Sequence, residues 1–145
     1  MPRISLVTDS AACIPAALKQ EFDIHQLAFE LVWDGTTHRD GVDLTPADFY
    51  HRSCQARTFP TTSQPPLGAF LTVYSELSQQ SDGIVSIHVS GDMTGTVRTA
   101  RLAAERSTRV SIRVLDSRTA MMAEGFVVLA AARGSRRRNI GASSR

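Results

Sequence analysis

Apolar runs of two kinds alternate along most of the chain. Short β-rich runs predict strands at residues 4–7, 83–89 and 110–115. Apolar residues at helical spacing predict amphipathic helices over 14–22 and 67–78. Because strands alternate with helices, the pattern predicts an α/β fold, a three-layer and mainly parallel sheet with helices on both faces and right-handed crossovers.

The segment from residue 24 to residue 66 follows this alternation less regularly. Residues 24–33 are apolar and extended, and Asp34-Gly35 is a turn signal, so a hairpin is predicted. Thr45-Pro46-Ala47-Asp48 supplies an N-cap hydroxyl, a first-turn proline and an acid, which predicts a helix through about Gln55. The three prolines and the hydroxyls of residues 59–66 predict a loop without regular structure.

The C-terminal third changes at Ala132 from an apolar segment to an arginine-rich one. A small-residue helix is predicted to end at Glu105, and residues 121–132 are apolar on every side, as in a buried helix. Residues 133–145 contain five arginines and no acid. This composition predicts a folded domain over 1–132 and a disordered basic tail over 133–145. The abrupt change also suggests the hypothesis that the tail is a frameshifted or truncated end.

Composition places the chain among ordinary globular proteins. Its 145 residues fit one domain, and 42% hydrophobic with 21% charged residues excludes a disordered chain. The net charge of +2 comes from the tail, because acids outnumber bases in the rest. The tail has no aromatic residue for base stacking, so no nucleic-acid partner is predicted.

Targeting signals and cysteine usage bear on location. The longest apolar run, residues 126–132, is too short to cross a bilayer, so no membrane insertion is predicted. The apolar run near the N-terminus is broken at once by Thr8 and Asp9, which does not make a secretory signal. Cys13 and Cys54 are therefore interpreted as reduced thiols, and the predicted location is cytoplasmic.

Hydroxyl-rich segments stand where ligands usually bind in parallel α/β sheets, just beyond the strands. Asp9-Ser10, residues 90–96 and Asp116-Ser117 each follow a predicted strand, and residues 61–63 precede a helix. Hydroxyls, backbone N–H groups and helix N-termini suit an anion such as a carboxylate or phosphate. These segments contain no lysine or arginine, which favours a singly charged anion over a triphosphate.

Five short motifs, in the same order along residues 4–132, resemble those of the DegV family of fatty-acid-binding proteins. They are Val7-Thr8-Asp9-Ser10, Arg39-Asp40-Gly41, Thr62-Ser63-Gln64-Pro65, Thr94-Gly95-Thr96 and Asp116-Ser117. The resemblance implies a DegV-like first domain of a two-domain bacterial protein. It implies a non-catalytic carrier that needs no cofactor, holds a long-chain fatty acid by its carboxylate and presents it to a partner fatty acid kinase.

The resemblance also implies roles for particular residues. Thr62 and Thr94 match the two family positions that contact the carboxylate, and Thr94 stands where the family usually has serine. The family's second domain adds further contacts, and this sequence ends before one, so an inactive remnant is a competing expectation. The residues expected to complete the site are Asp9, Ser10, Ser63, Ser90, Gly95 and Thr96.

An acyl chain needs an apolar slot as well as a head-group site. Side chains near the hydroxyl segments are candidates for its wall, methionine being adaptable to a flexible ligand. Each of them is also a candidate for ordinary core packing. The candidates are Phe70, Leu71, Met93, Met121 and Met122.

Other interpretations of the same residues remain open. Thr62 and Ser63 are candidates for capping the following helix, as is Thr94 for the next one. A small α/β hydrolase or phosphotransferase using Asp9 or Ser90 is the alternative function. The nucleophile motif Gly-x-Ser-x-Gly would require glycines at positions 88 and 92, which are His and Asp, and the phosphate-loop lysine is missing. The four histidines lack zinc-ligand spacing, so no metal site is predicted.

Overall fold

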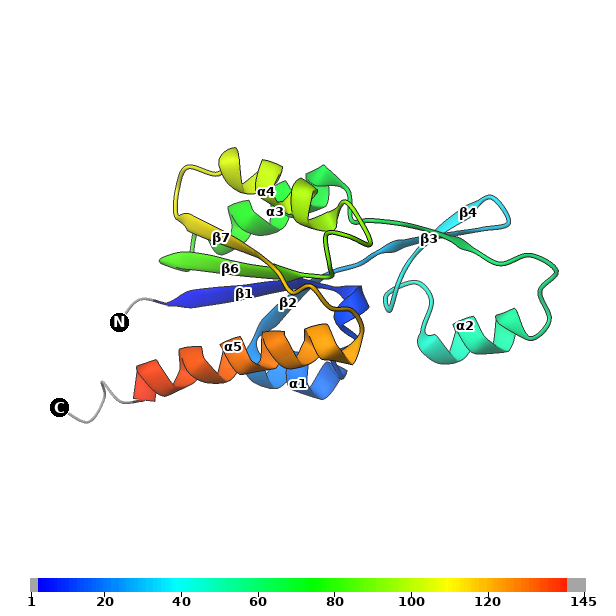
Figure 1. Ribbon diagram of the computed structural model, residues 1–145, viewed down its shortest axis with the longest axis horizontal. Coiled ribbons are helices and arrows are strands. Elements are labelled where there is room, and N and C mark those ends of the chain that lie inside the picture. The colour runs from blue at the N-terminus through cyan, green and yellow to red at the C-terminus, as the bar shows by residue number, and fades with distance from the viewer. Residues whose placement is uncertain (1–2, 141–145) are drawn as a thin grey trace.

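A four-stranded parallel sheet forms the centre of the molecule in the computed structural model, which describes residues 3–140 (Figure 1). The strand order is β2-β1-β6-β7, and every neighbouring pair is parallel. The predicted α/β class is confirmed. The strands are β1 (Ile4–Asp9), β2 (Ile24–Leu27), β6 (Gly83–His88) and β7 (Ser111–Asp116).

Helices cover both faces of this sheet, as the pattern predicted. Helices α3 (Leu67–Leu77) and α4 (Thr96–Glu105) lie on one face, and α1 (Ala16–Phe22) and α5 (Met122–Ile140) lie on the other (Figure 1). Both faces of the central strands are buried beneath these helices. In β1, Leu6 faces the core beneath α1 and α5, and Val7 faces the core beneath α3 and α4.

A second, antiparallel sheet extends from the main body (Figure 1). Its central strand β3 (Glu30–Trp33) pairs with β4 (Thr36–Arg39) and with β5 (Thr61–Ser63). The predicted hairpin is confirmed, and Asp34 and Gly35 at its turn have φ of 50° and 78°. The apolar run of residues 24–33 is divided between the two sheets, which its pattern did not predict.

Strand β5 corrects the prediction that residues 59–66 lack regular structure. Thr61–Ser63 pairs with β3 in an antiparallel register. The prolines at positions 60, 65 and 66 lie outside this short strand, so they remove none of its hydrogen bonds. β3 supplies the backbone partner, and that partner is far away in the sequence.

Helix α2 (Pro46–Ser53) packs against the second sheet. Its start is the predicted one: the Thr45 hydroxyl accepts from the backbone N–H of Asp48 at 3.2 Å, and the Asp48 carboxylate accepts in return from Thr45 N–H at 3.3 Å. The fully buried Trp33 anchors the packing, with Phe49 at 5.4 Å between ring centroids and the Arg52 guanidinium 4.5 Å above its ring.

Helix α5 differs from its prediction in burial and in length. Val128 is fully buried, but the Phe126 side chain is 66% exposed, so the helix is not buried on every side. The helix also continues beyond Ala132 to Ile140, because arginine is a good helix former and Arg136 lies 4.7 Å above the ring of Phe22. The predicted tail boundary is therefore not a helix end, and residues 141–145 lie outside the described residues.

The sequence predicts no membrane insertion. In the part of the chain that the structure describes, none of the helices combines the length and the apolar character that a bilayer crossing requires.

Candidate functional site

A cavity of about 420 Å³ lies between the two sheets. It begins where the parallel strands end, because Ser10 follows β1, Phe29 follows β2 and Val89 follows β6. Its volume is within the range of small-molecule sites, about 300–1,000 Å³. No lysine or arginine is among the described residues that line it. They are Ser10, Ala11, Cys13, Phe29, Leu31, Asp40, Pro46, Phe49, Tyr50, Thr62, Val89, Met93, Thr94, Ala120 and Met121.

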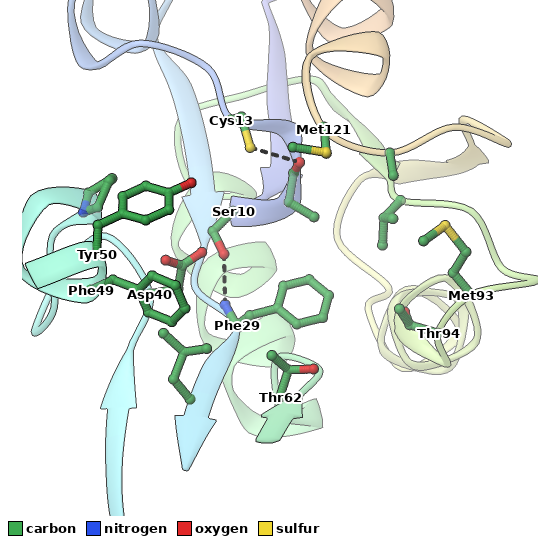
Figure 2. A pocket seen from close by; sticks show the side chains of 15 residues that line it. Ser10, Cys13, Phe29, Asp40, Phe49, Tyr50, Thr62, Met93, Thr94 and Met121 are labelled. Atoms are coloured by element: carbon green, nitrogen blue, oxygen red, sulfur yellow. Dashed lines mark hydrogen bonds between the residues drawn. The ribbon is translucent and has the colours of Figure 1, made fainter. Parts of the chain in front are cut away.

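Thr62 and Thr94 both line this cavity, although they belong to segments far apart in the sequence (Figure 2). Thr62 lies directly opposite Leu31 in the β3–β5 register, and opposite residues share a face of the sheet. Leu31 is itself part of the lining. The next residue, Ser63, points to the other face of β5 and is not part of the lining.

Gln64 holds the end of β5 against the start of α4. Its side-chain amide donates a hydrogen bond to the Thr99 hydroxyl at 2.7 Å. A Cβ atom at position 95 would meet the end of this side chain, so the Gln64 amide would have to shift. Gly95 therefore serves the close approach of two segments and does not line the cavity.

The Thr94 hydroxyl is positioned by Thr96. It accepts from the backbone N–H of Thr96 at 3.0 Å, and the two hydroxyl oxygens are 2.5 Å apart. When the fully buried Thr96 donates in that pair, the Thr94 proton is free to point into the cavity. Thr96 thus positions the Thr94 side chain through two hydrogen-bonding contacts.

The helix-capping interpretations of these residues are wrong. The N-cap of α3 is Pro66, which makes no side-chain capping bond, so neither Thr62 nor Ser63 caps that helix. The N-cap of α4 is Gly95, so Thr94 is not the N-cap, although its hydroxyl accepts from the backbone N–H of Thr96, the first residue of α4.

Ser10 lines the cavity, whereas its neighbour Asp9 does not. The Ser10 hydroxyl accepts from the backbone N–H of Phe29 at 3.0 Å and keeps its own proton for a second partner. Asp9 is fully buried and accepts from the N–H groups of Ala11 at 3.0 Å and Val89 at 3.1 Å. Asp9 therefore holds the backbone around the cavity.

Ser90 also has a structural role. Its hydroxyl accepts from the backbone N–H of Asp92 at 3.3 Å, and its own N–H donates to the Thr119 carbonyl at 2.8 Å. Only 6% of the residue is exposed, and it is not part of the cavity lining. This geometry does not favour Ser90 as a nucleophile.

Ser86, His88 and Asp9 are connected in the way of a catalytic triad but are inaccessible. His88 Nε2 lies 2.7 Å from the Ser86 hydroxyl, and His88 Nδ1 lies 3.0 Å from Asp9 Oδ2. The Tyr74 hydroxyl donates to Ser86 at 2.8 Å, and burial raises the pKa of Tyr74 to about 12. All four residues are fully buried outside the cavity lining, so a substrate cannot reach the serine.

The predicted apolar slot is only partly formed by its candidates. Met93 and Met121 line the cavity. Phe70 and Leu71 instead belong to the core beneath α3 and α4, and Met122 packs against the core on the opposite face of the sheet. Ordinary core packing is therefore the role of these three.

The cavity wall formed by the second sheet and α2 was not predicted from the sequence. Phe49 and Tyr50 of α2 and Leu31 of β3 belong to this wall. Asp40 also lines the cavity, and its place in the Arg39-Asp40-Gly41 motif was the available signal. Cys13 had no such signal, and burial followed by the charges of nearby carboxylates raises the pKa of its thiol.

Among the described residues, no group of three or more His, Cys, Asp or Glu side chains could hold a metal ion. The cavity therefore offers hydroxyls and backbone around an apolar interior as its binding chemistry.

Comparison with known proteins matches this arrangement to one family. The family model described as "Uncharacterised protein, DegV family" matches residues 3–137. Protein DegV of Bacillus subtilis (strain 168) is 34% identical over 129 residues, which make up 89% of this chain and 46% of that protein. The chain thus spans about half the length of the curated relatives it matches.

Solved structures show the same fold. The crystal structure of DegV, a fatty acid binding protein from Bacillus subtilis, matches with a TM-score of 0.88 and 33% identity, covering 92% of this chain and 47% of that one. A DegV family protein from Thermus thermophilus, described for its fatty acid binding, matches with a TM-score of 0.82 and 34% identity, covering 90% of this chain and 46% of that one.

Proposed function

Because the chain belongs to the DegV family, we propose that it binds a long-chain fatty acid by its carboxylate in the cavity between the two sheets. Two solved relatives at 33% and 34% identity are described as binding fatty acids. The observation that carries the proposal is that Thr62 and Thr94 line one apolar cavity. A carboxylate needs hydrogen-bond donors, and an acyl chain needs apolar walls.

Neutral hydroxyls suit the head group of this ligand. Ser10, Thr62 and Thr94 each contribute a hydroxyl to the lining, and each of these can donate a proton. Asp40 is the charged residue of the lining, and Figure 2 shows its side chain well apart from Thr94. A head group at Thr94 therefore avoids direct repulsion from that carboxylate.

Mass spectrometry of lipids extracted from the purified chain, followed by titration with stearate, tests the proposal. Thr62→Val removes the hydroxyl but keeps a β-branched side chain, and we expect it to weaken stearate binding about fivefold to tenfold, as one lost hydrogen bond predicts. Thr61→Val is the matched control, because Thr61 points to the other face of β5. Thr94→Ser keeps its hydroxyl and is expected to bind stearate like the original chain.

A chain that retains no fatty acid and takes up no stearate would contradict this function. Equal losses in Thr62→Val and Thr61→Val would show that the register of β5, and not the hydroxyl, sets the affinity.

We also propose that the bound fatty acid is presented to a fatty acid kinase. Thr94 lines both the cavity and a surface groove of about 620 Å³, whose charged residues are Arg98, Arg101, Asp92, Glu105 and Asp116. A carboxylate at Thr94 would therefore lie beside this groove. Acyl phosphate formed from stearate by a purified fatty acid kinase, with and without the chain, is the test, and equal yields would contradict this role.

The proposed site of action is the cytoplasm. Cys13 and Cys54 are both free and exposed thiols, a state that reducing compartments maintain. The nucleotide cosubstrate that a kinase requires is also found there.

A further inference from the structure

A row of buried polar side chains crosses the parallel sheet behind the cavity. It runs from Tyr74 on α3 through Ser86 and His88 on β6 to Asp9 on β1. Glu124, in the first turn of α5, is a neighbour of Asp9 and accepts a hydrogen bond from the adjacent Thr8. All five residues are fully buried, and His88 Nδ1 lies 3.0 Å from Asp9 Oδ2.

Glu124 has one satisfied oxygen and one that is not. Its Oε1 accepts from the Thr8 hydroxyl at 3.3 Å, while Oε2 is buried and has no hydrogen-bond partner among the described residues. Its charged neighbour is the Asp9 carboxylate. Burial first, and then the negative charge of Asp9, raise the pKa of Glu124 to about 9.

A proton on Glu124 removes the repulsion between its carboxyl group and that of Asp9. Two carboxylates are both acceptors, whereas a carboxylic acid has one O–H donor. The other titratable groups near this pair are His88, bonded to Asp9, and the Cys13 thiol, whose pKa is raised first by burial and then by the charges of Asp40, Glu124 and Asp9. Among the described residues, no lysine or arginine forms an ion pair with Glu124 that would favour its ionised form.

Asp9 connects this pair to the cavity wall. Its carboxylate accepts from the backbone N–H of Ala11, in the short 3-10 helix η1 (Ser10–Ala12), and of Val89, after β6. Both Ala11 and Val89 line the cavity. The orientation of Asp9 therefore sets two segments of that wall.

The first turn of α5 meets the same segments directly. A Cβ atom at Gly125 would lie 2.6 Å from the backbone carbonyl of Ala12, so α5 packs tightly on η1. Ala120 and Met121, just before α5, also line the cavity. Glu124 thus lies at the junction of η1 and the start of α5, two of the segments that form this wall of the cavity.

We propose that Glu124, as the neutral acid, donates a hydrogen bond to Asp9 and thereby positions the wall of the cavity formed by η1, Val89 and the start of α5. It touches no ligand and acts through Asp9. The inference rests on the proposed function only where stearate affinity is its readout.

Two variants of the full chain separate hydrogen bonding from packing at this position. Glu124→Gln keeps a donor for Asp9, and its stearate affinity is expected within about twofold of the original. Glu124→Met has similar length without a donor, and its affinity is expected to fall about tenfold. Above pH 9 the original chain is expected to lose stearate affinity as Glu124 ionises, whereas Glu124→Gln is not. Any change in the ionisation of stearate itself affects the original chain and Glu124→Gln equally.

Amide NMR signals of Ala11 and Val89 give a readout that needs no ligand. They are expected to stay in place in Glu124→Gln, to move in Glu124→Met, and to titrate near pH 9 in the original chain only. If the chain binds no stearate but shows these shifts, the proposed function is contradicted and the inference about Glu124 is still supported. The inference would be overturned if the signals did not move in Glu124→Met. It would also be overturned if Glu124→Gln and Glu124→Met lost the same stearate affinity. If Glu124→Met does not fold, the pH titration of the original chain against Glu124→Gln decides alone.

Discussion

Neighbouring hydroxyl residues in this protein have different roles because their side chains point in different directions. Thr62 lines the cavity and Ser63 does not, since successive residues of β5 alternate between its two faces. Ser10 lines the cavity, while Asp9 before it is turned inward to bind backbone N–H groups. The type of residue at a strand end thus indicates a site, and the local register decides which residue reaches it.

The buried Glu124 predicts an unusual pH dependence of stability. Its pKa is raised from 4.5 to about 9 in the folded chain, so between these values the folded state binds one more proton than the unfolded state. The free energy of unfolding is therefore expected to decrease by about 1.4 kcal/mol per pH unit as pH rises through this window, through this residue alone. Below pH 4.5 the group contributes no such slope.

Chemical denaturation between pH 5 and pH 9 measures this slope, with Glu124→Gln as the control. The variant keeps every other titrating group, so the difference between the two curves isolates Glu124. Parallel curves would show that Glu124 is not held as a neutral acid.

Three of the residues that the sequence predicts for the site lie in the lining of one cavity, and their contact with a ligand stays a prediction. Ser10, Thr62 and Thr94 were expected beside one another, and all three line this cavity. Asp9 and Ser90 were expected there too, yet both are turned toward backbone partners. Composition and spacing do not reveal such a turn, because it depends on hydrogen bonds formed only after folding.

At the scale of elements, the contact between α5 and η1 depends on the absence of a side chain. Gly125 lies against the carbonyl of Ala12, where a methyl group has no room. In the same helix, a Cβ atom at Gly134 would have no neighbouring atom within 4 Å. Replacement by alanine is therefore expected to have opposite effects on stability at these two positions.

Gly125→Ala is expected to destabilise the chain by about 1–3 kcal/mol, because backbone must move to admit the methyl group. Gly134→Ala is expected to be neutral or to stabilise by up to about 1 kcal/mol, since alanine favours the helix. Thermal or chemical denaturation of both variants measures the difference. Equal stability of the two would contradict tight packing of α5 on η1.

Elements with a local signal were predicted well. The Asp34-Gly35 hairpin and the Thr45 capping box are encoded by adjacent residues, and both formed as expected. Strand β5 and the division of residues 24–33 between two sheets were missed. Both depend on pairing with distant strands, which a local pattern does not contain.

At the scale of the whole molecule, the cavity joins two separately packed parts. Leu31 and Phe49 belong to the part formed by the second sheet and α2, whereas Val89 and Met121 belong to the parallel-sheet body. A ligand in the cavity would contact both parts at once. Because it binds only when they are correctly placed, its binding energy would add to the stability of their arrangement.

Stearate is therefore expected to slow amide hydrogen exchange in β3 and β5 as well as in η1 and residues 89–94. At a free concentration about 100-fold above its Kd, the added stability is about 2.7 kcal/mol. Hydrogen exchange with mass-spectrometric readout, with and without stearate, tests this. Slowing confined to the parallel sheet would place the ligand elsewhere.

The sequence by itself determined the alternation of strands and helices, the hairpin, the capped helix and the hydroxyl-rich strand ends, because propensity, periodicity and turn chemistry act between neighbours. Only the tertiary structure decided that Thr62 and Thr94 share one cavity, that α2 closes it, and that Asp9 and Glu124 face each other in the interior. These outcomes depend on strand pairing and helix packing between distant segments. The energy of those contacts exists only when the whole chain is folded.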